Sequence, residues 1–236
     1  MVQEKHRVVV HGIPGDMTRV RGLLRIMWPL FAALFAFGLF LGLTFPRFPP
    51  QWVGIGCGVT ALVLGFSIRG GARSLSAFFK GAHGEERVGF LLATLPAGCH
   101  VFHDLPGGMG NIDHVVVGPQ GIYAIETKCW SGKVTVAEDG RLLVDGKDPS
   151  RPPILQARRS AQVIGDYLQE RMEGAPPCEP IVCFASDTFE PGRQMCGPVT
   201  VCNASELLSV LTAKETRLSS NEIERVVQVL EQKDES

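Results

Sequence analysis

The sequence predicts an α/β domain, in which a mixed sheet lies between helices, preceded by two transmembrane helices. Residues 26–46 and 48–68 are two long runs without a charged side chain. Beyond them, short apolar stretches that fit strands are followed by longer stretches with the helical period of 3.6 residues. A sheet packed between helices is the expected arrangement for this order of elements.

The two uncharged runs have the length of membrane spans. Each holds about 20 residues, enough to cross roughly 30 Å of hydrocarbon, and Pro-Arg-Phe-Pro-Pro separates them. One such run would also fit a buried core helix, but two in succession favour a transmembrane hairpin over residues 26–68. The late start of the first run argues against a cleaved signal peptide. We therefore expect this segment to contact the lipid bilayer.

Basic residues flank the predicted spans. Five lysine and arginine residues lie within residues 1–25, three more lie within residues 69–80, and the connecting loop holds only Arg47. By the positive-inside rule, both ends of the chain face the cytoplasm. The sequence thus predicts a multi-pass protein of the inner (cell) membrane, with a cytoplasmic tail over residues 1–25 and a linker over residues 69–83.

Charge and cysteine content exclude some classes of protein. Residues 70–236 hold 16 lysine and arginine residues against 22 aspartate and glutamate residues, so this part is not a generic basic nucleic-acid binder. The seven cysteines include no Cys-x-x-Cys pair. Their spacing argues against both a zinc module and a disulfide framework.

Local patterns predict the elements of the domain. A helix begins near residue 84, with Glu85 and Glu86 in its first turn, where carboxylates favour the helix dipole. Strands are predicted over 99–105, 179–186 and 198–203, and β-hairpins over 110–128 and 133–146. Further helices are predicted over 152–172, 204–213 and 219–232. The last of these opens with the capping-box pattern Ser219-x-x-Glu222.

Each strand of the first predicted β-hairpin carries a carboxylate. If Gly118 and Gly121 close the turn, Asp113 lies directly opposite Glu126, and Lys128 shares their face. Two carboxylates about 5 Å apart repel each other unless a cation lies between them or one binds a proton. A divalent metal with oxygen ligands meets this need. The same register makes both faces of the hairpin largely apolar, as in a central sheet covered by helices.

These residues resemble a nuclease family. A carboxylate on one strand, followed by Glu-x-Lys on the next, resembles the PD-(D/E)xK nuclease superfamily, although Asn-Ile-Asp stands where the superfamily has Pro-Asp. More narrowly, the segments GEERV, GNIDHVVVGPQGIYAIETK and PILQARRSAQVI resemble the NERD (nuclease-related) domain over about residues 84–168. The resemblance implies a restriction-endonuclease-like mixed sheet flanked by helices, in a NERD-like domain over residues 84–236.

The resemblance also implies roles for the hairpin residues. Asp113 and Glu126 would hold Mg²⁺ or Mn²⁺, with Glu85 as an additional ligand and Thr127 lending its backbone carbonyl. Lys128 would position or help deprotonate the attacking water and would offset negative charge at the scissile phosphate. These are the expected parts of a metal-dependent hydrolytic site.

The helix over residues 152–172 is expected to complete the site. The resemblance implies that Gln156 orients water or a ligand, as part of the catalytic group. Arg151, Arg158 and Arg159 flank it and are the best candidates for a phosphate-binding, nucleic-acid-contacting patch. A solvated, exposed helix face is the plainer interpretation of all four residues.

Plainer interpretations also exist for the acidic residues. Glu126 and Lys128 fit an ion pair on one face of a strand. Asp113 fits a cap of the Gly-rich loop that precedes it, and Glu85 fits a first-turn residue that favours the helix dipole.

The function we expect is that of a membrane-anchored, divalent-metal-dependent nuclease, which hydrolyses phosphodiester bonds of DNA or RNA at the cytoplasmic membrane face. The joint presence of the candidate carboxylates, lysine and glutamine favours it. The net negative charge of the domain favours instead a non-catalytic, membrane-tethered interaction module that keeps a nuclease-like fold. A homo-oligomer or an unidentified protein would then be the partner. A third alternative is a regulator that recognises lipid headgroups through its N-terminal arginines.

Overall fold

The computed structural model describes residues 8–44, 50–108 and 110–234. The chain divides into two compact units, one formed by Met17–Lys80 and the other by Met1–Asp16 together with Gly81–Ser236. Part of the predicted tail, residues 1–7, and most of the loop predicted between the two spans lie outside the described residues.

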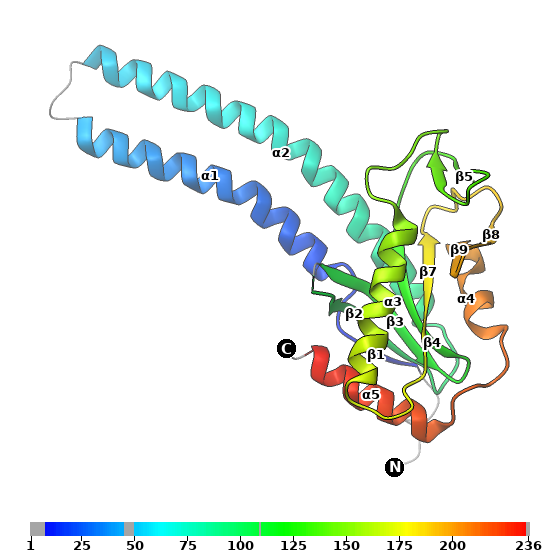
Figure 1. Ribbon diagram of the computed structural model, residues 1–236. Coiled ribbons are helices and arrows are strands. Elements are labelled where there is room, and N and C mark those ends of the chain that lie inside the picture. The colour runs from blue at the N-terminus through cyan, green and yellow to red at the C-terminus, as the bar shows by residue number, and fades with distance from the viewer. Residues whose placement is uncertain (1–7, 45–49, 109, 235–236) are drawn as a thin grey trace. The chain divides into compact units, whose positions relative to one another are not determined.

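Two long helices contain most of the two uncharged runs (Figure 1). Helix α1 spans Asp16–Thr44 and helix α2 spans Pro50–Leu92. In the described part of the chain, no helix combines the length and the apolar character that crossing a membrane requires. The predicted transmembrane hairpin over residues 26–68 is therefore not supported. The predicted linker over residues 69–83 is helical, because glycines, even the adjacent Gly70 and Gly71, weaken a helix by only about 1 kcal/mol each and do not by themselves end it.

A seven-stranded mixed sheet forms the frame of the second unit, with the strand order β1-β2-β3-β4-β7-β9-β8. Its strands are β1 (Val9–His11), β2 (His100–Pro106), β3 (Asn111–Gly118), β4 (Gly121–Lys128), β7 (Cys178–Phe184), β8 (Arg193–Cys196) and β9 (Val199–Asn203). Strands β4, β7 and β9 are parallel to one another, β1 is parallel to β2, and the other neighbours are antiparallel. A separate ribbon pairs β5 (Val134–Val136) with β6 (Leu142–Val144).

Helices cover both faces of this sheet (Figure 1). One face packs against α3 (Pro153–Gln169) and α5 (Ser220–Asp234), and the other packs against the C-terminal end of α2 and α4 (Ala204–Thr212). The central strands β3 and β4 are buried on both sides. The predicted mixed sheet flanked by helices is thus confirmed, as are the two hairpins and the helices that follow them.

The helices on the first face begin as their sequences predict. Pro153 lies in the first turn of α3, where its missing N–H leaves no hydrogen bond unmade. At the start of α5, the N–H and the hydroxyl of Ser219 donate to Oε2 of Glu222 at 2.8 and 2.6 Å. This contact confirms the predicted capping box.

The β3–β4 hairpin has the predicted register. Gly118 pairs with Gly121 at the turn, and His114 pairs with Ile125 at the far end of the ladder. Gly121 has a φ of 140°, a conformation that favours glycine, so the turn requires this residue type. The register places Asp113 and Glu126 next in line, directly after the last pair.

Strand β3 is irregular at Asp113. The β2–β3 ladder pairs His103 with His114 and Leu105 with Ile112, and passes over Asp104 and Asp113. Asp104 has a φ of 55°, a left-handed conformation that non-glycine residues rarely adopt. Side chains therefore change face at this point. Ile112 packs in the same core as residue 115, three positions away, although strict alternation would place them on opposite faces.

Two short edge strands depart from the prediction. Strand β1 lies in the predicted tail over residues 1–25, for which no strand was expected, and β8 lies in a segment without a predicted element. They are three and four residues long, and such short strands gain their order from pairing with a neighbour. All seven cysteines are free thiols.

Candidate functional site

The candidate site lies where strands β3 and β4 separate. β4 continues to Lys128 in parallel pairing with β7, whereas its ladder with β3 ends at His114 and Ile125. Beyond that pair, the backbone N–H of Thr127 donates a 2.7 Å hydrogen bond to Oδ2 of Asp113. The Asp113 side chain thus occupies the place that a strand carbonyl would otherwise take. This hydrogen bond ties the Asp113 side chain to β4, whereas the alternative interpretation expected it to cap the preceding Gly-rich loop.

Glu126 and Lys128 form an ion pair on β4. Nζ of Lys128 lies 2.5 Å from Oε1 of Glu126, and the two side chains are 18% and 8% exposed. Their spacing of two residues brings them to the same face of the strand, as predicted. The pair is therefore real, and its burial at the end of the sheet distinguishes it from an ordinary surface ion pair.

Glu85 reaches the same region from helix α2. Its position differs from the prediction, because α2 begins at Pro50 and Glu85 lies near the C-terminal end, far from the first turn. The helix dipole therefore cannot explain this carboxylate, which is 7% exposed. Gly84 permits the close approach of α2 to the end of β4, since a Cβ at this position would lie 2.7 Å from Cβ of Cys129.

Glu126 and Glu85 act electrostatically on Asp113. Burial raises the pKa of Asp113 well above its usual range, and the nearby carboxylates of Glu126 and Glu85 raise it further. The ammonium of Lys128 and the hydrogen bond from Thr127 act in the opposite direction and do not outweigh them. The carboxyl of Asp113 consequently holds a proton more tightly than an ordinary aspartate does.

A small cavity of about 100 Å³ lies beside Glu126 and is lined by Gln156 and Arg159 of α3. Oε1 of Gln156 is buried and has no hydrogen-bond partner within the described residues. The helix therefore presents an unsatisfied polar group to the site, and Gln156 is not the plain exposed residue of the alternative interpretation. Ser160 and Asn111 also line the cavity. Sequence reasoning missed both, although the spacing of four residues places Ser160 above Gln156 on the same helix face.

The three arginines predicted to bind nucleic acid do not form one patch. Arg159 lines the small cavity beside Glu126, whereas Arg158 lines a second, larger cavity of about 520 Å³. Adjacent helix residues point about 100° apart, which explains the separation. Arg151 precedes the helix and is exposed. Only Arg159 is thus placed beside the carboxylates.

The carboxylates do not form a ready-made metal centre. Among the described residues, no group of three or more His, Cys, Asp or Glu side chains is arranged to hold an ion. The chemistry of the donors nevertheless suits a hard divalent cation, because Mg²⁺ and Mn²⁺ prefer carboxylate and carbonyl oxygens. A cation would also relieve the repulsion by Glu126 and Glu85, which adds to burial in raising the pKa of Asp113.

Fold and site together define an α/β domain with buried carboxylates and a lysine at the end of a mixed sheet. The family model of NERD, the nuclease-related domain, matches residues 80–185. This segment contains every candidate metal-binding and catalytic residue and supports the predicted domain, although residues 186–236 lie beyond the match. No curated protein and no solved structure matches the chain.

Proposed function

We propose that this domain is a divalent-metal-dependent nuclease that hydrolyses phosphodiester bonds of DNA or RNA. One observation carries the proposal. Three carboxylates and a lysine lie close enough to interact electrostatically where β3 and β4 separate, within the segment that the nuclease-related model matches. An ordinary sheet would place apolar side chains at such a position, because uncompensated buried carboxylates are unfavourable.

In this proposal Asp113, Glu126 and Glu85 hold Mg²⁺ or Mn²⁺, and Thr127 contributes its carbonyl. Their side chains must move closer together to do so, because no three of the acidic groups are in metal-binding arrangement. When bound, the ion would lower the pKa of water and screen the charge of the attacked phosphate. The N–H of Thr127 already fixes one oxygen of Asp113 and leaves the other for the ion.

The remaining residues bind and orient the substrate. Lys128 supplies fixed positive charge next to the carboxylates, where negative charge accumulates as the phosphate is attacked. The unsatisfied Oε1 of Gln156 accepts a hydrogen bond from a water molecule in the small cavity. Arg159 lies at the same cavity and contacts a phosphate of the substrate.

We also propose that the protein acts at the inner membrane, with both termini in the cytoplasm. The support is the flanking basic charge and the apolar surface of the two-helix unit. Trp28, Phe31 and Phe35 of α1 and Phe66 of α2 are all exposed, and such a surface is normally covered by lipid or by another apolar surface. Membrane fractionation with alkaline extraction tests this part. Recovery of the full chain in the aqueous fraction would contradict it.

Cleavage assays test the nuclease directly. The full chain is incubated with labelled single- and double-stranded DNA and RNA, in Mg²⁺, Mn²⁺ or EDTA. We expect cleavage that requires the metal, is lost in Asp113→Asn and Lys128→Ala, and persists in Asp166→Asn, an exposed carboxylate of α3. Cleavage that survives the first two substitutions would place the activity elsewhere.

The second candidate function is a non-catalytic interaction module with a nuclease-like fold. The observation in its favour is that no three of the acidic groups are arranged for a metal, while Lys128 already pairs with Glu126. This function predicts no cleavage in any metal and no Mn²⁺ binding by calorimetry. Metal-dependent cleavage rules it out.

A further inference from the structure

A second cavity lies beside the N-terminal half of α3, with a volume of about 520 Å³. Its walls come from the turn between β5 and β6, from the first residues of α3 and from the turn between β8 and β9. The small cavity of the candidate site is lined by α3 residues of the same two turns, namely Gln156 and Arg159. The two cavities therefore border the same two turns of one helix, whose diameter with side chains is about 10–12 Å.

The walls of this larger cavity combine apolar side chains with the planar guanidinium group of an arginine. Pro152, Leu155 and Pro198 are among its apolar residues. Arg141 contributes a guanidinium group that is held in place, because its Nε donates to Asp139 and its Nη1 donates to Asp148, both at 2.5 Å. A guanidinium fixed at its edge in this way keeps its flat faces available for stacking on an aromatic ring.

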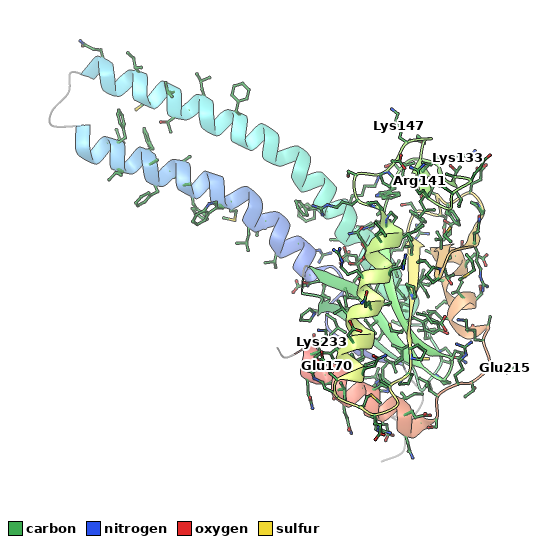
Figure 2. The ribbon with its side chains drawn as sticks, in the orientation of Figure 1. Lys133, Arg141, Lys147, Glu170, Glu215 and Lys233 are labelled. Carbon is green, nitrogen blue, oxygen red and sulfur yellow. The ribbon has the colours of Figure 1, made fainter. Side chains whose placement is uncertain are left out.

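Arg158 provides positive charge at the same cavity. Its side chain is exposed. Figure 2 shows Lys133, Arg141 and Lys147 on the β5–β6 ribbon, at the end of the sheet where α3 begins. Arg141 pairs with Asp139 and Asp148, which also line the cavity, and Lys133 pairs with Glu190. Arg158 is the cation of the cavity that we assign to a phosphate contact.

We propose that this cavity binds one nucleobase of a single-stranded nucleic acid, whose phosphate backbone passes over α3 to the carboxylate site. The proposal rests on the proposed nuclease function and adds the class of substrate to it. Arg141 stacks on the base, the proline and leucine side chains cover its other face, and Arg158 contacts the adjoining phosphate. The volume is ample for a base with its sugar, since small-molecule sites typically enclose about 300–1,000 Å³.

The geometry selects single strands over duplexes. A base within a duplex has both faces covered by its neighbours, so only an unpaired or flipped base can enter a cavity. Stacked nucleotides advance about 3.4 Å each along a strand. A base in this cavity would then lie about three nucleotides from the phosphate at the carboxylates.

Equilibrium binding of fluorescent oligonucleotides to the full chain tests the inference. The oligonucleotides are short single strands, either intact or with one abasic position moved along the strand, and EDTA prevents cleavage. We expect one abasic position to weaken binding roughly tenfold, the scale of one base-stacking contact. Leu155→Asp should weaken binding of the intact strand by a similar factor, and should have little further effect on the strand that lacks this base.

Phe90→Asp is the matched control. Phe90 and Leu155 are both exposed apolar helix residues, but Phe90 lines a different cavity, on α2. The control should bind like the unmodified protein. Equal weakening of intact and abasic strands by Leu155→Asp would mean contact with the backbone alone and would overturn the inference. Binding that Leu155→Asp leaves unchanged would also overturn it.

The outcome is separable from that of the nuclease proposal. Cleavage in Mn²⁺ without any dependence on the base contradicts the cavity inference and keeps the nuclease. Base-dependent binding without cleavage in any metal keeps the cavity and contradicts the nuclease. If no single strand binds at all, the cavity inference is wrong whatever the result of the cleavage assay.

Discussion

The backbone N–H of Thr127 donates to Oδ2 of Asp113 over 2.7 Å, across the gap where β3 leaves β4. A side-chain carboxylate here takes the place of a strand carbonyl. The hydrogen bond keeps Asp113 attached to the sheet, and the negative charges of Glu126 and Glu85 act on its carboxyl group. Such irregular points within a sheet commonly carry function, because they aim a side chain where a regular strand could not.

Removal of the Asp113 charge should stabilise the metal-free protein. Its pKa is raised in the folded state by burial and by two carboxylates. The folded protein therefore binds this proton more tightly than the unfolded chain does, and stability falls as pH rises above the unfolded value of about 3.9. Asp113→Asn keeps an oxygen acceptor for Thr127. We expect it to raise the melting temperature by roughly 2–4 °C at pH 8, which corresponds to about 1 kcal/mol.

Thermal unfolding followed by circular dichroism in EDTA, between pH 4.5 and 8, checks this expectation. The gain in melting temperature of Asp113→Asn over the unmodified protein should shrink as the pH falls toward 4. Asp166→Asn, on the exposed side of α3, is the control and should not change the profile. A less stable Asp113→Asn protein at pH 8 would mean that the carboxylate is already compensated within the fold.

Loss of the Lys128 side chain should destabilise the protein. Lys128→Ala leaves Glu126, which is 8% exposed, without its ion-pair partner. We expect the free energy of unfolding to fall by roughly 1–2 kcal/mol, within the range for a buried group left unpaired. Glu126→Gln in the same chain should restore most of the loss, because it removes the uncompensated charge. Urea unfolding of the two single variants and the double variant measures this coupling; additive effects would contradict it.

A side chain at residue 84 should disturb the site through α2. A Cβ there would lie 2.7 Å from Cβ of Cys129, which has no freedom to rotate away. Gly84→Ala should therefore destabilise the protein by roughly 1–3 kcal/mol, and should weaken Mn²⁺ binding by displacing Glu85.

The matched control is Gly165→Ala in α3, where a Cβ would meet no atom within 4 Å. Alanine at that position should be neutral or stabilising by up to about 1 kcal/mol. Urea unfolding compares the two variants. Equal stability of the two variants would mean that α2 and β4 can separate without cost.

A buried histidine pair should make the fold sensitive to acid. Nδ1 of His103 lies 2.7 Å from Nδ1 of His114. Burial is the main cause that lowers the pKa of His103 to about 4, and it lowers the pKa of His114 well below its usual range. The unfolded chain binds protons at about pH 6.5, so stability should fall between pH 6.5 and 4, by up to about 1.4 kcal/mol per pH unit for each histidine.

Urea unfolding across this pH range measures the slope. His103→Gln should reduce this slope by up to about 1.4 kcal/mol per pH unit, which is the contribution of one histidine. His83→Gln is the control, since that side chain is 83% exposed. If His103→Gln and the control give the same slope, the pair is not what destabilises the fold in acid.

Local patterns were sufficient to predict much of the fold. The turn glycines determine the β3–β4 register, and the register brings Asp113 next to Glu126. The capping box of α5 is equally local, because Ser219 and Glu222 are three residues apart. Such features depend only on residues a few positions apart along the chain, so they can be predicted from the sequence.

Other features depend on contacts between distant segments. At Asp104, which has a left-handed conformation, the side chains of β2 and β3 change from one face of the sheet to the other. No residue pattern in the sequence indicates this change. Helix α2 continues into the domain because it packs against the sheet through Val88 and Leu92, which moves Glu85 from a helix start to a helix end. The pairing of His103 with His114 could have been found by extending the hairpin register to β2.

The claim on which this account depends is that a divalent cation neutralises the cluster of Asp113, Glu126 and Glu85. Isothermal titration of the full chain with Mn²⁺ tests it most directly. We expect one Mn²⁺ bound per chain, with binding lost in Asp113→Asn and retained in Asp166→Asn. A protein that binds no Mn²⁺, or an Asp113→Asn variant that binds it equally well, would contradict the account.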